Sequence, residues 1–367
     1  MMKRPVTTRI AALVLCSVVI ATCPMPADAQ VGNVASGADQ PRTLTLAYYY
    51  PWYIRGDWSR HRYVGTPKLG TYGTDEPAVA EQHIRWARRG GIDALVVSWW
   101  GPEDLTYKHI NRGFLKADNL GEIRFAIIYE SLGRLDAVDG KTDSVIDFAQ
   151  PAVLKRFIAD LRLLKETHFN HPSYLTLGDR PLVVLYVTRT FRNFKRTHIE
   201  QAEQAIDLDL YLVADEPFFG RQKDPKTALN GIDKSGSPLF DAYTTYNLFE
   251  NARVQDGETA WEYIQREALP VFKQWSRTTV FCPNVMPSYH DFRGNKKLRG
   301  DLAGFKAQLE AVQRLPRYDD APDDPRLIFV TSFNEWWEGT TIEPAEEYGT
   351  TYLDVLRTTI APGSESR

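Results

Sequence analysis

The sequence predicts a single α/β domain, a (β/α)8 barrel, and three observations lead to this prediction. Eight short apolar runs recur along the chain, helical patterns lie between them, and together they fill about 320 residues. The runs are nearly continuous in apolar residues, which is typical of parallel strands buried on both faces. An open doubly wound sheet is the competing fold. Residues 45–53 (TLAYYYPWY) lack the glycine-rich phosphate loop that would favour it.

The strand candidates are rich in β-branched, leucine and aromatic residues. In chain order they cover residues 44–50, 94–99, 124–129, 182–187, 210–214, 242–246, 279–284 and 327–332. The helix candidates repeat apolar residues at intervals of three and four, and the first ends at a glycine pair suited to a helix C-cap. They cover residues 77–90, 153–165, 197–205, 260–271 and 301–315. This alternation places the barrel in residues 43–367.

The N-terminus has the three-part pattern of a secretory signal peptide. Lys3, Arg4 and Arg9 precede an apolar run over residues 10–21, and small residues at 27–29 (ADA) supply a cleavage site. We therefore expect a signal peptide over residues 1–29, cleaved after Ala29, and a secreted or periplasmic protein. The apolar run is too short to span a bilayer, which needs about 20 residues, so no stable membrane insertion is expected after cleavage. Residues 30–42 are small and polar and predict a flexible linker.

Charge and cysteine content exclude several classes of protein. With 44 Lys and Arg against 47 Asp and Glu, the net charge of −3 lacks the basic excess of a nucleic-acid-binding protein. The three cysteines form no CxxC pair, and no HExxH spacing occurs, so we expect no metal and no cofactor. Two of these cysteines lie in the expected signal peptide, which leaves Cys282. The sequence makes no prediction of the oligomeric state.

Aromatic and acidic residues gather where the predicted strands end. In a (β/α)8 barrel the carboxyl ends of the strands carry the active site, so these residues are expected to share one cleft. The candidate substrate-binding residues are Tyr49, Tyr50, Trp52, Trp99, Trp100, Glu130, Tyr186, Asp215, Glu216, Tyr246, Asn334 and Trp337. Aromatic rings stack on the apolar faces of sugars, and carboxylates and amides bind sugar hydroxyls. Packing in the core is the alternative for any single aromatic residue. We favour a sugar-binding cleft because three strand ends share the pattern.

Two carboxylates follow the last predicted strand in the segment Asn334-Glu335-Trp336-Trp337-Glu338. Glycoside cleavage needs two such groups, one that donates a proton and one that is ionised. Burial and repulsion between like charges separate the pKa values of neighbouring carboxyls, which would give both roles at one pH. An acidic turn at the start of a helix is the alternative. Placed after the eighth strand, Glu335 and Glu338 are our candidate catalytic residues.

Five segments resemble glycoside hydrolase family 99 and the wider group of domains similar to it, whose best-known members are endo-α-mannosidases. They are residues 47–53 (AYYYPWY), 90–101 (GGIDALVVSWWG), 125–130 (FAIIYE), 181–186 (PLVVLY) and 331–344 (TSFNEWWEGTTIEP). The last is the most specific. Together they reach from the first predicted strand to the eighth.

The resemblance implies a (β/α)8 barrel that hydrolyses internal α-mannosidic linkages with retention, without a metal or organic cofactor. It implies that Glu335 removes the proton of the substrate 2-hydroxyl, which attacks the anomeric carbon to give a 1,2-anhydro sugar. Glu338 would protonate the leaving oxygen and then activate water. Glu130 is similar to a family residue near the reacting sugar. The expected partner is an oligosaccharide or polysaccharide.

The sequence departs from this family at one position of its most specific motif. Characterised members usually read NEWHEG, and Trp337 replaces the histidine here. This substitution adds stacking area and removes a polar edge, so the pocket must differ. Two alternatives therefore stay open: a non-hydrolytic protein for carbohydrate binding or polysaccharide assembly, and a double displacement with Glu335 as the nucleophile.

Overall fold

The computed structural model describes residues 43–360, except residues 139, 142, 218–221, 247, 249–254, 256, 292–295, 320, 322 and 323. The expected signal peptide (1–29) and linker (30–42) lie outside the described residues. None of the described helices is long and apolar enough to cross a membrane.

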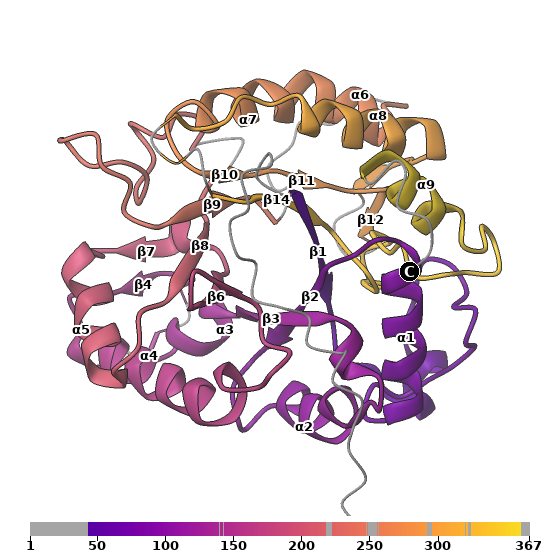
Figure 1. Ribbon diagram of the computed structural model, residues 1–367, viewed down its shortest axis with the longest axis horizontal. Coiled ribbons are helices and arrows are strands. Elements are labelled where there is room, and N and C mark those ends of the chain that lie inside the picture. Colours follow the sequence, from indigo (N-terminus) through magenta and orange to yellow (C-terminus); the bar gives the residue numbers. More distant parts are fainter. Residues whose placement is uncertain are drawn as a thin grey trace, which may run out of the picture. The chain divides into compact units, whose positions relative to one another are not determined.

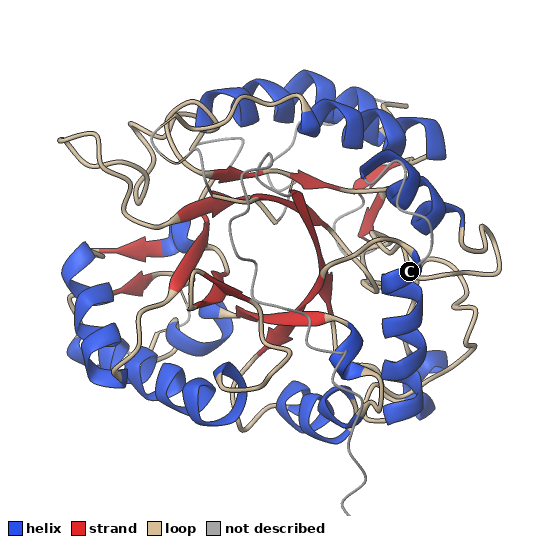
Figure 2. Ribbon diagram, viewed as in Figure 1, coloured by secondary structure: helices blue, strands red, loops and turns tan. Residues whose placement is uncertain are grey.

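Parallel strands form a ring at the centre of the described chain, and helices surround it (Figures 1 and 2). The strands are β1 (Thr43–Tyr49), β2 (Ala94–Trp99), β3 (Arg124–Tyr129), β6 (Arg180–Leu185), β8 (Tyr211–Asp215), β9 (Ala242–Thr244), β10 (Phe281–Cys282), β11 (Asn284–Val285) and β14 (Arg326–Val330). They pair in the order β10-β9-β8-β6-β3-β2-β1-β14-β11, with every pair in this path parallel. This is the predicted (β/α)8 barrel.

The barrel closes at its seventh strand, which is broken into two short pieces by Pro283. β10 pairs with β9 and ends at Cys282, whereas β11 begins at Asn284 and pairs with β14. Proline has no backbone N–H and cannot continue a ladder of hydrogen bonds. Its carbonyl oxygen still accepts a hydrogen bond from the Phe329 N–H at 2.9 Å. The single predicted strand over residues 279–284 is therefore two pieces that join opposite edges of the sheet.

The helices lie outside the ring and confirm the five predicted helical regions, with some changes of length. They are α1 (Pro77–Arg89), α2 (Leu105–Arg112), α3 (Ser131–Leu135), α4 (Pro151–Leu164), α5 (Arg196–Ile206), α6 (Ala260–Tyr263), α7 (Leu269–Trp275), α8 (Leu302–Gln313) and α9 (Thr351–Ile360). One π-turn (Lys165–Phe169) extends α4, and another (Ile264–Ala268) joins α6 to α7. The helices α2, α3 and α9 were not predicted.

Short strands outside the barrel complete the fold. They are β4 (Ile146–Asp147), β5 (Thr176–Leu177), β7 (Phe191–Arg192), β12 (Tyr289–Asp291) and β13 (Lys296–Leu298). The β12–β13 hairpin follows β11 and therefore lies at the carboxyl end of the barrel, where its backbone contacts the loop after β14.

Candidate active site

The alternation of side chains along each strand decides which residues face the inside of the barrel. Neighbouring residues of a strand point to opposite faces, so the last residue of a strand and its successor diverge. Tyr49, at the end of β1, points to the helices, and its hydroxyl lies 3.1 Å from Nδ1 of His83 in α1. Trp99, at the end of β2, stacks on Tyr129. The residues that follow them, Tyr50 and Trp100, line a cavity instead.

This cavity lies at the carboxyl ends of the strands and has a volume of about 510 Å³. It is large enough for a small ligand such as a short oligosaccharide, since pockets for small ligands span roughly 300–1,000 Å³. Six aromatic residues and three glutamates line it. They are Tyr50, Trp52, Trp100, Tyr186, Tyr246, Trp337, Glu130, Glu335 and Glu338.

The aromatic side chains of the cavity support one another. Trp52 stacks on Tyr50 with ring centroids 4.3 Å apart, and the edge of Tyr246 meets Tyr186 at 5.6 Å. Trp337 packs against His61 at 4.4 Å and against Tyr63 at 5.2 Å. Rings held by other rings lose little conformational freedom when a ligand stacks on them.

Both candidate catalytic glutamates lie on the loop that follows β14, and hydrogen bonds close this loop on itself. The hydroxyl of Ser332 accepts from the Glu335 N–H at 2.7 Å, and Glu335 Oε1 accepts from the Trp337 N–H at 2.8 Å. The Glu338 carbonyl oxygen accepts from the His290 N–H of β12 at 2.7 Å. Glu335 is buried, whereas Glu338 is half-buried and therefore more open to water.

Asn334 does not line the cavity but joins the first and last strand ends. Its Oδ1 accepts from the Tyr50 N–H at 2.8 Å, and its Nδ2 donates to the Tyr50 carbonyl at 3.1 Å. The Tyr53 hydroxyl donates to the Asn334 carbonyl at 2.7 Å and accepts from the Trp336 N–H at 3.0 Å. Asn334 is fully buried, so it fixes the loop rather than contacting a ligand.

A buried network behind the cavity was missed by the sequence reasoning. The fully buried Glu343 accepts hydrogen bonds from the Tyr72 hydroxyl at 2.8 Å and from the Trp336 indole at 2.9 Å, both at Oε2. Its Oε1 lies 3.2 Å from Nε2 of His83. The network anchors the indole of Trp336, which stands between the two candidate catalytic glutamates in the chain. Its signal was present in the sequence, since Glu343 belongs to the specific segment 331–344 and His83 to the apolar face of the first predicted helix.

Glu130 projects into the cavity from the end of β3. Its Oε1 accepts a hydrogen bond from the Ser98 hydroxyl at 2.6 Å, and Ser98 in turn accepts from the Trp100 indole at 2.9 Å. Burial raises the pKa of Glu130, and the charges of Asp215, Asp104 and Glu338 add to this effect, so that the pKa is about 8 although the hydrogen bond from Ser98 lowers it. Glu130 is therefore largely protonated at neutral pH.

Besides Asn334, four predicted substrate contacts lie outside the cavity: Tyr49 and Trp99, described above, and the fully buried pair Asp215 and Glu216. The Asp215 carboxylate accepts from the backbone N–H groups of Val187 at 3.1 Å and Tyr246 at 2.9 Å, and forms an ion pair with Arg189. These contacts tie three strand ends together.

Glu216 likewise holds a loop in place. It accepts from the Thr188 hydroxyl at 2.8 Å and the Asn230 N–H at 3.0 Å, and burial raises its pKa to about 7. The sequence placed both carboxyls correctly at a strand end, but could not show that backbone donors occupy them.

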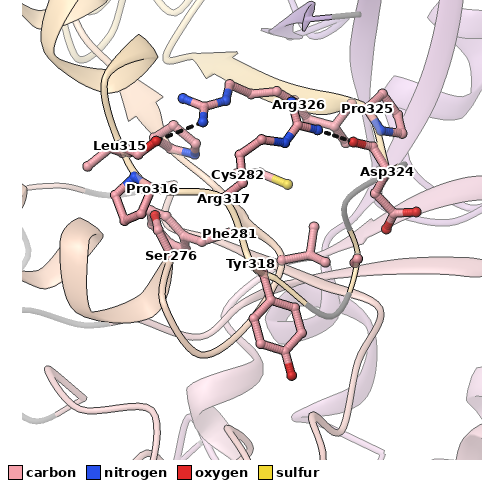
Figure 3. Close-up of a pocket in the computed structure, with 14 residues that line it drawn as sticks. Ser276, Phe281, Cys282, Leu315, Pro316, Arg317, Tyr318, Asp324, Pro325 and Arg326 are labelled. Atoms are coloured by element: carbon pink, nitrogen blue, oxygen red, sulfur yellow. Dashed lines mark hydrogen bonds between the residues drawn. The ribbon is translucent and has the colours of Figure 1, made fainter. Parts of the chain in front are cut away.

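A second, much smaller pocket lies at the opposite end of the barrel, near the amino ends of β10 and β14 (Figure 3). Its volume of about 30 Å³ has room for about one water molecule. The thiol of the buried Cys282 lines it, and burial raises the pKa of this thiol, so the thiol stays protonated and unreactive. Arg326 and Arg317 close it through the Leu315 and Asp324 carbonyls. It shares no lining residue with the aromatic cavity.

Among the residues that the structure describes, no cluster of histidine, cysteine, aspartate and glutamate could hold a metal ion. The residues that line the cavity offer carboxyl groups, phenol hydroxyls and aromatic faces.

A closed barrel with paired carboxyls and stacking rings at the carboxyl ends of its strands defines a carbohydrate-active type of site. The chain belongs to glycosyl hydrolase family 99, whose family model matches residues 57–358. The chain is 23% identical over 304 residues to a glycoprotein endo-alpha-1,2-mannosidase of Rattus norvegicus, which covers 78% of this chain and 59% of that protein. It is also 23% identical over 305 residues to the uncharacterized protein WxcX of Xanthomonas campestris pv. campestris, covering 79% of this chain and 42% of that protein. The chain thus spans less than two thirds of the curated relatives it matches.

Solved structures share the fold. A glycoside hydrolase-like protein matches with a TM-score of 0.64 and 18% identity over 91% of this chain and 98% of that one. The GH99 endo-alpha-mannosidase from Bacteroides thetaiotaomicron matches with a TM-score of 0.57 and 18% identity over 86% of this chain and 95% of that one. These similarities confirm the predicted barrel.

Proposed function

We propose that this protein is an exported, retaining glycoside hydrolase that cleaves α-mannosidic or related α-glycosidic linkages within a glycan chain. The observation that carries the proposal is the cavity in which Glu335 and Glu338 stand beside six aromatic residues. Stacking rings would bind the sugars, and the two carboxyls would supply the acid and the base. Membership of glycosyl hydrolase family 99 supports this choice.

In the proposed reaction Glu335 removes the proton of the substrate 2-hydroxyl. The 2-oxygen forms a bond to the anomeric carbon, the bond from that carbon to the leaving oxygen breaks, and Glu338 gives its proton to the leaving oxygen. Glu338 then removes a proton from water, which attacks the anomeric carbon of the 1,2-anhydro sugar and breaks the bond from that carbon to the 2-oxygen. The 2-oxygen takes back the proton held by Glu335. Two inversions give net retention.

The surroundings of the two glutamates suit this division of roles. Glu338 is half-buried and therefore within reach of water, which the second step consumes. Glu335 is buried and oriented by the Trp337 N–H, which suits a base that meets a bound hydroxyl rather than solvent.

The test is product release from a panel of α-mannans and bacterial surface polysaccharides. We expect new reducing ends in internal positions of one class of polymer, with an α-anomer formed first by NMR. Glu335→Gln and Glu338→Gln should each lower kcat at least 100-fold. Glu346→Gln removes an exposed carboxyl of the same loop and should leave the rate unchanged.

Other outcomes identify the alternatives. Binding of a glycan without any new reducing end would contradict hydrolysis and favour the carbohydrate-binding role. Detection of a covalent glycosyl-enzyme by mass spectrometry would contradict the anhydro-sugar route and favour a double displacement with Glu335 as the nucleophile.

The export part of the proposal rests on the N-terminal pattern of residues 1–29. Expression of the full chain followed by N-terminal sequencing should find a mature protein that begins at Gln30. A mature protein that retains Met1 and stays inside the cell would contradict it.

A further inference from the structure

A continuous chain of hydrogen bonds joins one aromatic wall of the cavity to one of its carboxyls. The indole N–H of Trp100 donates to the Ser98 hydroxyl at 2.9 Å, and the Ser98 hydroxyl donates to Glu130 Oε1 at 2.6 Å. An indole nitrogen can only donate, so the hydroxyl hydrogen of Ser98 is left to point at the carboxyl. The indole bond therefore has a fixed direction, and Ser98 is the donor to Glu130 whenever that carboxyl is ionised.

Close packing holds the first member of this chain in place. A Cβ atom at Gly133 would lie 2.3 Å from the ring of Trp100, so the ring rests directly on the backbone of α3. The backbone N–H of Trp100 donates to the Thr106 hydroxyl at 3.3 Å, which fixes the main chain that carries the ring. The indole cannot turn without losing its packing against Gly133, and its movement would also release Ser98.

Ser98 itself is fully buried, and Glu130 is only 4% exposed. Water therefore cannot easily replace either hydrogen bond, and a buried donor or acceptor that loses its partner pays the full cost of desolvation. Because Ser98 lies in β2 and Trp100 directly follows the end of this strand, one chain segment presents both groups to Glu130.

We propose that Ser98 is a positioning residue for the proposed reaction, which makes the Trp100 wall and the Glu130 carboxyl one rigid unit. A sugar that stacks on Trp100 then meets a carboxyl at a fixed position, with its free oxygen available to a sugar hydroxyl. The inference rests on the proposed function for its kinetic consequence but not for its structural content.

The hydrogen bond from Ser98 also affects the charge state of Glu130. A hydrogen bond to a carboxylate favours the ionised form, so Ser98 opposes the effect of burial. The ionisable groups that act on Glu130 or respond to it come from the ends of four strands (β1, β6, β8 and β14) and from the β2–α2 loop. They are Tyr48, Tyr50, Asp104, Tyr186, Asp215 and Glu338. Among these groups Ser98 is a neutral donor, and its removal changes no charge.

The experiment follows the titration of Glu130 in protein labelled with 13C at the glutamate carboxyls, with Glu130→Gln to assign the signal. In Ser98→Ala the midpoint should move to higher pH, because the ionised carboxyl loses its donor. Ser131→Ala is the matched control: it removes a buried serine hydroxyl next to Glu130 that binds the Tyr129 carbonyl instead. Its midpoint should equal that of the wild type.

Kinetics supply the second measurement. In Ser98→Ala, kcat/KM should fall roughly tenfold, and the limb of the pH–rate profile that belongs to Glu130 should move to higher pH. Ser98→Thr keeps the hydroxyl and should restore both properties. The losses in Ser98→Ala and Trp100→Phe should not add in the double variant, because both break the same unit.

Each result decides the matter. If Ser98→Ala titrates as the wild type does, or if Ser98→Thr shifts as much as Ser98→Ala, the inference is overturned. If no glycan is cleaved by the wild type while the Glu130 midpoint still moves in Ser98→Ala, the proposed function fails and the role of Ser98 in placing Glu130 stands.

Discussion

The carboxamide of Asn334 binds both main-chain groups of Tyr50, accepting from its N–H at 2.8 Å and donating to its carbonyl at 3.1 Å. One side chain thus continues the pairing of β1 with β14 beyond the point where the strands end. Because Tyr50 lines the cavity and Glu335 follows Asn334, the bond pair sets the position of a cavity wall relative to a candidate catalytic carboxyl.

Asn334→Asp should break this relationship while keeping the size of the side chain. A carboxylate cannot donate to the Tyr50 carbonyl, and two oxygens would face each other in a buried place. We expect a loss of about 2 kcal/mol in the free energy of unfolding. Asn111→Asp is the control, because it removes a single Nδ2–carbonyl bond on α2. Equal losses in the two variants, measured by chemical unfolding at pH 7, would contradict the special role of Asn334.

Replacement of Glu343 should show how much the loop after β14 depends on its buried anchor. Glu343→Ala leaves the Tyr72 hydroxyl and the Trp336 indole without their acceptor, and we expect a loss of about 3 kcal/mol in stability. Glu343→Gln should cost less, since its oxygen can keep both donors and His83 can accept from the amide by changing tautomer. Thermal unfolding of both variants beside Glu346→Ala tests this order. A Glu343→Gln variant as unstable as Glu343→Ala would contradict it.

The pH dependence of activity should report on Glu130. Its pKa of about 8 means that the carboxyl is protonated at neutral pH and ionises as the pH rises. The protonated carboxyl can donate a hydrogen bond to a sugar hydroxyl, and ionisation removes this donor, so kcat/KM should fall above about pH 8 in the wild type. Glu130→Gln imitates the protonated carboxyl and should lose this alkaline limb. A limb that persists in Glu130→Gln belongs to another group.

The buried His168 should make the protein sensitive to acid. Burial lowers its pKa to about 4, below the value of about 6.5 in an unfolded chain. The unfolded state therefore binds more protons between these values, and stability falls as the pH drops from about 6.5 to about 4, by roughly 3 kcal/mol.

The test is chemical unfolding at pH 7 and pH 4.5. His168→Phe should show a smaller difference between the two pH values than the wild type, because the group that takes up the proton on unfolding is gone. His61→Gln, at an exposed histidine, should keep the wild-type difference. An unchanged difference in His168→Phe would show that other groups cause the acid sensitivity.

The fold followed from the sequence because its signal is local and repeated. Each parallel strand is buried on both faces, so its apolar run is continuous, and the eight runs could be found one by one. The break at Pro283 was not predicted, because it depends on tertiary pairing: the first piece of the strand pairs with β9 and the second with β14. The short helix α2 was missed because its start depends on capping by Asp104 rather than on a long apolar face.

The site was predictable to the level of the strand end, but not to the single residue. Nine of the residues named from the sequence line the cavity, including Glu335 and Glu338. The predictions that Tyr49 and Trp99 contact the substrate were wrong, because a shift of one position along a strand reverses the direction of a side chain. The prediction for Asp215 was wrong for another reason: only the fold shows that backbone N–H groups already donate to its carboxylate oxygens.

The two candidate catalytic glutamates come from one loop, whereas the aromatic walls come mainly from the ends of other strands. The residues proposed to carry out the reaction and most of the residues proposed to contact the sugar therefore lie in separate segments of the sequence. Substitution of the aromatic lining residues can change which glycan the cavity binds. The loop after β14 has its own internal hydrogen bonds, so its structure can stay the same. Trp337 is the exception, because it belongs to the loop and lines the cavity. A substitution of Trp337 would therefore affect both the choice of sugar and the loop that carries the two candidate catalytic glutamates.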